Sequence, residues 1–166
     1  MNAHYAKIAR KIHIGHGFNI YDHLIKIPLI FYNKDIIHKG ESKIPVRQID
    51  IFPSILDIIG IDPKINVRGK SVLPIINNQD NTPREQYVEA VGSTIPKKED
   101  WLAGLRIDNK YKFIYAPFRD DFKEELYFLE TDPQEKNNVA KYNLKLVNKF
   151  KKKIESIGAE NMIGQK

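Results

Sequence analysis

Apolar and polar residues follow two different patterns in the two halves of the chain. In the second half, short segments rich in aromatic and β-branched residues predict β-strands at residues 86–91, 103–107, 111–116 and 125–129. Asp108-Asn109-Lys110 is a tight polar connection between two of them. Apolar residues at helical spacing then predict a terminal helix over 141–156, which Gly158 is expected to end. This half therefore predicts a four-stranded antiparallel sheet followed by a helix.

The first half has the pattern of helices and one short apolar strand. A helical turn that begins near Tyr21 is expected to stop before Pro28, and residues 29–32 then predict a strand. Asp50 is the expected N-cap of a helix that Gly60 ends. The apolar face expected to pack in the core of that helix is Ile51, Ile55, Ile58 and Ile59. A polar linker over 77–83 is the predicted boundary between the halves.

Length and composition narrow the class of protein. A chain of 166 residues is long enough for one domain with a hydrophobic core. No cysteine is present, which excludes disulfides, thiolate metal sites and a cysteine nucleophile. No apolar run approaches the roughly 20 residues of a membrane span, and the first residues lack the apolar region of a signal peptide. From the sequence as written we expect a cytoplasmic protein without a membrane partner.

A net charge of +6 raises the question of a polyanionic partner. The excess of Lys and Arg lies near the two ends of the chain, over 7–11 and 145–153. Such a patch alone would supply only salt-dependent, non-specific affinity for nucleic acid. We therefore expect solvated helix faces and no nucleic-acid partner.

His16 is the candidate chemical group of the chain. It lies between Gly15 and Gly17, and glycine on both sides lets the backbone take unusual conformations and lets a ligand approach closely. The alternative is a histidine that only hydrogen-bonds the backbone of a glycine turn. A zinc site built from His4, His13, His16 and His23 is not expected, since no carboxylate precedes Asp22.

Three stretches, in order, carry a resemblance to a known family. They are GHGFNIYDHLIKIPLIFY from Gly15, VRQIDIFPSILDIIGI from Val46, and LYFLETDPQEKNNVA from Leu126. Together they resemble the later part of sulfatases, which belong to the alkaline phosphatase superfamily. The resemblance implies an α/β fold class: residues 1–80 would be a remnant of the catalytic core, including one strand of its sheet. Residues 81–166 would be the small antiparallel C-terminal subdomain with its terminal helix.

The resemblance also implies a chemistry. Sulfatases cleave sulfate esters with a formylglycine made from the Cys or Ser of a C/S-x-P-x-R motif, beside a divalent cation, Ca or Mg. In the family, a Lys or His shortly after the metal-binding pair contacts the sulfate, and His16 is the residue that fits. We expect no metal or other cofactor in this chain, because it has neither that nucleophile motif nor the Asp-His-Gly or Asp-Asn-Gly string that should precede residue 15. The string from Ser42 to Arg47 is one residue too long.

The function predicted from these observations is that of a C-terminal fragment of a sulfatase-like hydrolase, inactive alone. It would meet a sulfate ester only when an N-terminal portion completes it, and its uncovered apolar faces would favour self-association. One alternative is a non-catalytic basic binding or scaffold module for polyanions. Another is part of a phosphoester or phosphonate hydrolase of the same superfamily, since kinship of fold does not separate these substrates.

Overall fold

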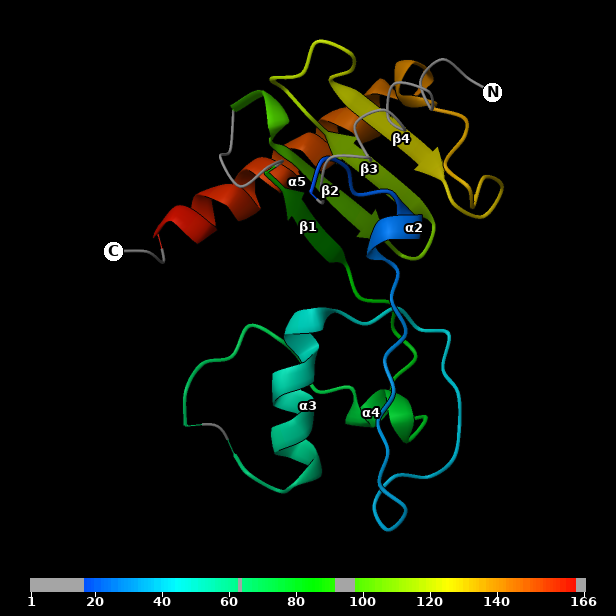
Figure 1. The fold of residues 1–166 in the computed structure, drawn as a ribbon, viewed down its shortest axis with the longest axis vertical. Coiled ribbons are helices and arrows are strands. Elements are labelled where there is room, and N and C mark those ends of the chain that lie inside the picture. Colours follow the sequence, from blue (N-terminus) through cyan, green and yellow to red (C-terminus); the bar gives the residue numbers. More distant parts are fainter. Residues whose placement is uncertain (1–16, 63, 92–97, 164–166) are drawn as a thin grey trace. The chain divides into compact units, whose positions relative to one another are not determined.

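The structure is a computed structural model that describes residues 17–62, 64–91 and 98–163 (Figure 1). The chain forms two compact units. Unit 1 combines the described residues up to Ile27 with Tyr87–Arg106 and the residues from Lys110 onward. Unit 2 comprises Pro28–Gln86 and Ile107–Asn109. Unit 1 is thus assembled from separate stretches of sequence. The predicted division at residue 80 concerns the two domains of the family fold that the sequence resembles, and it stays a prediction.

Unit 1 is organised on a sheet with the strand order β1-β2-β3-β4. The strands are β1 (Gln86–Ala90), β2 (Leu102–Ile107), β3 (Tyr111–Tyr115) and β4 (Glu124–Phe128). β3 and β4 are antiparallel, with Phe113 opposite Leu126. Asp108 and Asn109 join β2 to β3 with φ of 53° and 54°, a backbone that Asp and Asn tolerate in tight hairpins. The predicted four-stranded antiparallel sheet is confirmed, with strand ends within one residue.

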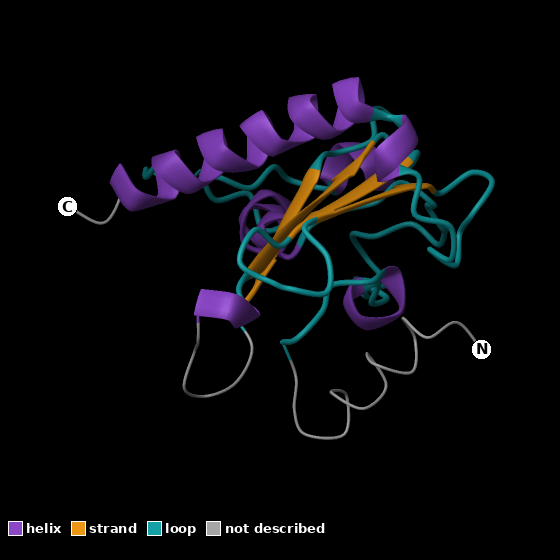
Figure 2. Ribbon diagram, turned by 90° about the horizontal axis from the view of Figure 1, so that it is seen from above, coloured by secondary structure: helices purple, strands orange, loops and turns teal. Residues whose placement is uncertain are grey.

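Helix α5 (Leu144–Ile163) covers one face of this sheet, after the short helix η3 (Ala140–Tyr142) (Figure 2). The Phe150 ring lies 5.8 Å from the ring of Tyr111 and 5.9 Å from that of Phe113. The predicted terminal helix is confirmed, but its predicted end at Gly158 is wrong. Gly158 does not take a positive φ, and the helix continues past it, since one glycine costs a helix only about 1 kcal/mol.

The opposite face of the sheet is covered by the segment that leads into helix α2 (Asp22–Ile25). Ile20 and Tyr21 are buried there in one cluster, with Leu102, Ile114, Tyr127 and Leu129 among its members. The approach is close: a Cβ on Gly104 of β2 would lie 2.4 Å from Ile20 Cδ1. The predicted helical turn after Tyr21 is confirmed, and it lies on the sheet of unit 1.

Unit 2 contains the short helix η1 (Gln48–Asp50), followed by α3 (Ile51–Ile58) and α4 (Leu73–Ile76). Gly60 has a φ of +72° just after α3 and ends it as predicted. Asp50 occupies the N-cap position of α3 as predicted, but its side chain makes no capping hydrogen bond to that helix. The carboxylate is instead used by side chains and backbone from other parts of unit 2.

Two further expectations for unit 2 are wrong, one about burial and one about a strand. Ile55 and Ile59 were expected in the core but are 46% and 56% exposed, whereas Pro53 and Ser54 are the buried residues of α3. Residues 29–32 form no strand here. In the described chain their backbone has no hydrogen-bonding partner. No helix of the described part has the length and apolar character needed to cross a membrane.

Candidate functional site

His16, the predicted sulfate contact, lies outside the described residues, as do His4 and His13. Its role therefore stays a prediction. The description begins at Gly17, whose φ of 91° is one that side chains with a Cβ rarely adopt. Glycine at position 17 is thus needed for this backbone conformation.

The residues directly after Gly17 are held on the sheet by long side chains. Lys112 Nζ donates a hydrogen bond of 2.7 Å to the carbonyl of Ile20, and Tyr21 Oη donates one of 2.7 Å to Glu125 Oε2. Glu125 lies opposite Ile114 in the β3–β4 register, on the sheet face that carries Lys112. A segment with only one short helix is therefore fixed by two strands distant in sequence.

A buried cluster of charges completes this attachment. Lys112 Nζ lies 3.0 Å from Asp22 Oδ1 and 3.6 Å from Glu135 Oε1, and Arg106 Nε lies 3.3 Å from Asp22 Oδ2. The main-chain N–H of Asp22 donates a 2.6 Å hydrogen bond to Glu135 Oε2. Burial raises the pKa of the Glu135 carboxyl above its usual value, against the opposing effect of Lys112. These charges are positioned by one another, as expected for a structural network.

Glu135 belongs to the third family-like stretch and has a strained backbone. Its φ is +52°, and its N–H donates a 3.1 Å hydrogen bond to the carbonyl of Asp132. The Asp132 carboxylate in turn accepts hydrogen bonds from the N–H groups of Lys136 and Asn137. This tight turn presents the Glu135 carboxylate to Asp22. The stretch from Leu126 to Ala140 therefore helps to attach the start of α2 to the rest of unit 1.

Arg119 is a further buried residue of this region. Its Nη2 donates hydrogen bonds to the carbonyl of Phe18 and, at 3.2 Å, to that of Asp100, and burial lowers its pKa. Analysis of the sequence missed both Arg119 and Lys112. Lys112 alternates with aromatic residues along β3, a pattern that places a lysine on a solvent-facing side of a strand. Only the packing of the segment before α2 shows that this side is buried.

Three other side chains that could carry chemistry or recognition have structural surroundings. The exposed His23 ring stacks on Tyr21, with centroids 6.1 Å apart. Trp101 contacts Tyr115 edge-on at 6.4 Å, as an anchor of the sheet would. Ser42 is exposed, and its Oγ accepts a 3.2 Å hydrogen bond from the N–H of Ile44. The string from Ser42 to Arg47 is thus a surface loop and its entry into unit 2.

Unit 2 holds a second polar cluster, centred on Asp50. The buried carboxylate lies 2.8 Å from Arg47 Nη2 and 2.9 Å from Arg84 Nη1, and accepts a 2.9 Å hydrogen bond from the N–H of Lys70. Burial alone would raise the pKa of Asp50, but these donors outweigh it and lower the pKa to about 2. The cluster ties the start of α3 to residues 70 and 84.

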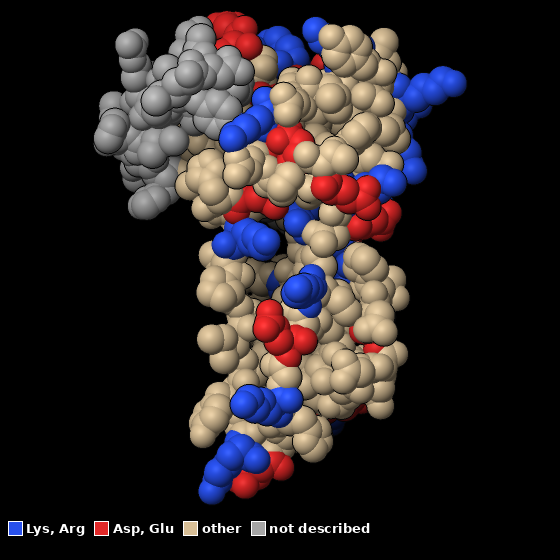
Figure 3. All heavy atoms as spheres, turned by 90° about the vertical axis from the view of Figure 1, so that its right-hand side faces the viewer, with Lys and Arg blue, Asp and Glu red and all other residues tan. Residues whose placement is uncertain are grey.

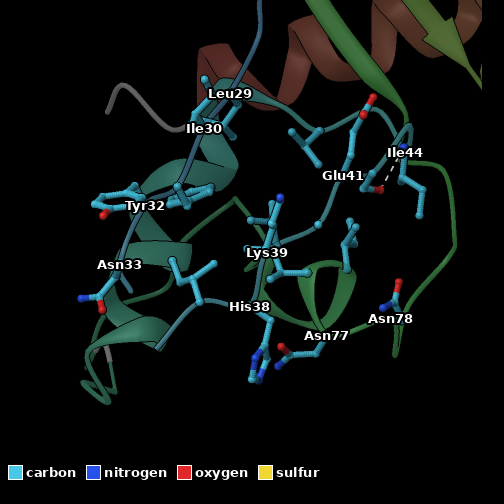
Figure 4. A pocket seen from close by; sticks show the side chains of 18 of the residues that line it. Leu29, Ile30, Tyr32, Asn33, His38, Lys39, Glu41, Ile44, Asn77 and Asn78 are labelled. Atoms are coloured by element: carbon cyan, nitrogen blue, oxygen red, sulfur yellow. Dashed lines mark hydrogen bonds between the residues drawn. The ribbon is translucent and has the colours of Figure 1, made fainter. Parts of the chain in front are cut away.

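Unit 2 also contains a pocket with a volume of about 1230 Å³. Figure 4 shows polar side chains such as His38 and Asn77 on one part of its wall and Leu29 and Ile30 on another. The lining includes the apolar residues Phe31, Ile44, Val46, Val72 and Ile75. The pocket is therefore lined by apolar side chains on one part and by polar side chains on another.

No metal centre can be assembled from the described residues. Within residues 17–62, 64–91 and 98–163, no three His, Cys, Asp or Glu side chains are placed to hold an ion. The divalent cation that the family resemblance implies therefore does not fit the described part of the chain. The described residues instead provide a backbone segment next to Gly17 that is firmly attached to the sheet.

Comparison with known proteins gives a consistent result. A family model described as N-sulphoglucosamine sulphohydrolase, C-terminal, matches residues 17–160. Human N-acetylglucosamine-6-sulfatase is 40% identical over 151 residues, which cover 74% of this chain and 27% of the relative. An N-acetylglucosamine-6-O-sulfatase of Bacteroides thetaiotaomicron is 26% identical over 129 residues, which cover 72% of this chain and 22% of the relative.

A solved structure shares the fold. The phosphonate monoester hydrolase of Agrobacterium radiobacter superimposes with a TM-score of 0.53 at 24% sequence identity. The superposition covers 67% of this chain and 24% of that chain. The chain spans about a quarter of the length of the curated relatives it matches.

Proposed function

Because the chain belongs to the sulfatase family, whose C-terminal region it matches over residues 17–160, we propose that it is the C-terminal part of a sulfuric ester hydrolase and is inactive alone. The observation that carries this proposal is the contrast between that match and the missing chemistry. The chain has no cysteine, and its described residues hold no set of metal ligands. The rest of the catalytic apparatus has to come from the portion of the fold that this chain does not span.

Within such an enzyme, the role of unit 1 is to position the backbone next to His16. The sheet holds Phe18 to Asp22 through buried hydrogen bonds and ion pairs, and Gly15, His16 and Gly17 directly precede this segment in the sequence. We propose that His16 contacts the sulfate oxygens, where an imidazole can stabilise negative charge. A divalent cation, Ca or Mg, bound by the other part would polarise the ester.

Turnover of 4-nitrophenyl sulfate tests this proposal. The purified chain is assayed with added Ca²⁺ or Mg²⁺, beside the full-length sulfatase of Bacteroides thetaiotaomicron as a positive control. We expect no turnover above the blank for the chain alone. Turnover that disappears with a chelator would show a complete active site in the chain and would refute its inactivity.

A phosphonate or phosphate ester is a second candidate substrate class. The likeness to the phosphonate monoester hydrolase supports keeping it, although at 24% identity the likeness concerns the fold alone. Once a completed enzyme is available, phenyl esters of sulfate, phosphate and phosphonate can be compared at one pH. The ester with the highest kcat/KM identifies the substrate class.

One feature favours a basic binding module as the alternative function. Lys145, Lys149 and Lys152 are exposed on α5 at a spacing that places them along one side of the helix. On the face shown in Figure 3, by contrast, positive side chains are scattered among negative ones. Retention on heparin resin over a salt gradient distinguishes the two: a polyanion binder elutes only at high salt, and elutes earlier after Lys145, Lys149 and Lys152 are replaced by Gln.

A further inference from the structure

The net positive charge of the chain comes from one stretch around helix α5, once both signs are counted. The chain has 27 Lys and Arg side chains against 21 Asp and Glu. Six of the lysines lie in residues 141–154, which contain no Asp or Glu, so the rest of the chain carries 21 charges of each sign. The charge of +6 is therefore a property of this stretch and not of the chain as a whole.

The exposed lysines of α5 point directly away from the sheet. Val147 and Phe150 form part of the buried side of the helix. Lys145, Lys149 and Lys152 are exposed, and at 3.6 residues per turn they lie on the opposite side. Helix α5 is the outer layer of unit 1 on its side of the sheet (Figure 2). A flat surface can therefore approach the whole row without meeting another described element of unit 1.

This row of lysines has no acidic partner among the described residues. Lys151 differs, because its ammonium group pairs with Glu124 at 2.6 Å. Lys145 and Lys149 are four residues apart, a spacing at which like charges destabilise a helix. A solvated helix face usually has acidic residues among its lysines, whereas no carboxylate lies within four residues of either Lys145 or Lys149 in the sequence. An anionic surface outside the chain would offset this repulsion.

Two exposed apolar side chains lie at the start of the same helix. Tyr142 is 74% exposed and Leu144 is 65% exposed. Lys141 Nζ lies 4.6 Å from the centroid of the Tyr142 ring, so positive charge and apolar surface are combined here. A dissolved polyanion would attract the lysines but leave the Leu144 side chain in water. The interface of an anionic bilayer accepts both, because lysines pair with headgroups while aromatic and aliphatic side chains enter the acyl boundary.

These observations point to one partner. We propose that α5 binds the surface of an anionic phospholipid bilayer, with Lys145, Lys149 and Lys152 against the headgroups and Tyr142 and Leu144 at the interface. A basic amphipathic helix is a common feature of such contacts. The contact is peripheral and independent of the proposed hydrolase activity. It departs from the expected absence of a membrane partner, which rested on the lack of an apolar run of roughly 20 residues.

Cosedimentation with vesicles tests this contact on the full chain as it stands. Vesicles of phosphatidylcholine alone are compared with vesicles that contain about 30% phosphatidylserine, at low and at high salt. We expect the chain to bind only the anionic vesicles at low salt. Binding should fall steeply as the salt concentration rises, because salt screens the attraction between exposed charges.

Substitution of the lysine row tests its part of the contact. Replacing Lys145, Lys149 and Lys152 together by Gln should lower the partition coefficient by roughly 100-fold, since each lysine near an anionic surface contributes roughly fivefold. The matched control removes the same charge from three exposed lysines of unit 2, by replacing Lys34, Lys39 and Lys64 with Gln. The control should lower the partition coefficient by less than about threefold, because these lysines do not face the bilayer.

Substitution of the apolar side chains separates a bilayer from a dissolved polyanion. Tyr142→Ser and Leu144→Ser, made together, should weaken binding to anionic vesicles by at least about fivefold, because less apolar surface leaves water. The salt dependence should stay the same, since no charge is lost. Binding of heparin and of duplex DNA, measured beside the vesicles, should be weaker than vesicle binding and should not change in this variant. Circular dichroism confirms that each variant is folded.

Three results would overturn the inference. The first is no binding to anionic vesicles, or equal binding to neutral ones. The second is an equal loss of binding in the α5 variant and the unit 2 control, which would show attraction by net charge alone. The third is tighter binding to heparin or duplex DNA than to vesicles, with no effect of the Tyr142 and Leu144 substitutions, which would identify a dissolved polyanion as the partner.

Discussion

Lys112 Nζ lies 3.0 Å from Asp22 Oδ1, and the Lys112 side chain has no exposed surface. Lys112 is in β3, whereas Asp22 begins α2, 90 residues earlier in the sequence. The pair thus joins the two separate stretches from which unit 1 is built. Removing either charge would leave the other one buried with fewer partners, which is the costly way to disrupt a buried pair.

Lys112→Met should lower the free energy of unfolding of unit 1 by about 3–5 kcal/mol, because Asp22 and Glu135 lose a buried cation. Urea unfolding followed by the fluorescence of Trp101, the single tryptophan of the chain, measures this change within unit 1.

The matched control is Lys110→Met, two residues earlier. Lys110 and its partner Glu130 are both largely exposed and 3.9 Å apart, so this change should cost no more than about 0.5 kcal/mol. Equal effects of the two substitutions would show that the buried cluster does not hold unit 1 together.

Tyr21→Phe should destabilise unit 1 by about 1–3 kcal/mol. The variant keeps the buried ring but removes the hydroxyl that donates to the buried Glu125 carboxylate. Tyr142→Phe is the control, because Tyr142 is 74% exposed and its loss of a hydroxyl should have no measurable effect. Thermal unfolding of the two variants beside the wild type is sufficient, and a lower Tm for Tyr142→Phe would contradict the prediction.

Unit 2 should lose stability in acid through Asp50. Its pKa is about 2 in the folded chain against an ordinary value of 3.8, so the carboxylate stabilises the fold fully above about pH 4. That contribution, on the order of 2 kcal/mol, is lost as the pH falls from about 4 to 2. Hydrogen exchange of α3 amides, measured across this range, follows unit 2 directly.

Asp50→Asn should abolish this part of the pH dependence and make unit 2 less stable at pH 7, since an amide cannot match the paired arginines. Asp62→Asn, at an exposed position of the same unit, should keep the acid-induced loss. A wild-type profile that stays flat down to pH 2 would be incompatible with the role assigned to Asp50.

Gly158→Ala should stabilise α5 by about 0.5–1 kcal/mol. Gly158 lies inside the helix without a positive φ, and an added Cβ would meet nothing within 4 Å. The helical signal in circular dichroism and the Tm should both rise. Gly104→Ala is the opposite case, because its Cβ would clash with Ile20, and a rise in Tm there would contradict the packing described for β2.

The sequence predicted well the parts of the fold that depend on local pattern. All four strands, the terminal helix and the stop at Gly60 follow from alternation, spacing and a glycine at a positive φ. The failures share a physical cause, because a local pattern does not show which distant groups a residue meets. Asp50 has the local features of a helix cap, but Arg47, Arg84 and Lys70 compete for its carboxylate. Ile55 and Ile59 have the spacing of a core face, but the described part of the chain leaves them exposed.

Only part of the candidate site could be predicted from the sequence. The glycines around His16 predict an unusual backbone conformation, and Gly17 has a positive φ. The side chains that hold the following segment come from residues about 100 positions away, and no periodic pattern distinguishes a buried Lys112 or Glu135 from an exposed one. Only the three-dimensional pairing of strand faces identifies them.

The discontinuous construction of unit 1 has a consequence for how the chain is made in the cell. Ile20, Tyr21 and Asp22 leave the ribosome before their partners Lys112, Glu125 and Glu135, which follow 92, 104 and 113 residues later. At typical rates of translation, this delay is roughly 5 to 20 seconds. During that time the apolar side chains of Ile20 and Tyr21 have no sheet to cover them, so the nascent chain presents a binding site for chaperones until β4 has been synthesised.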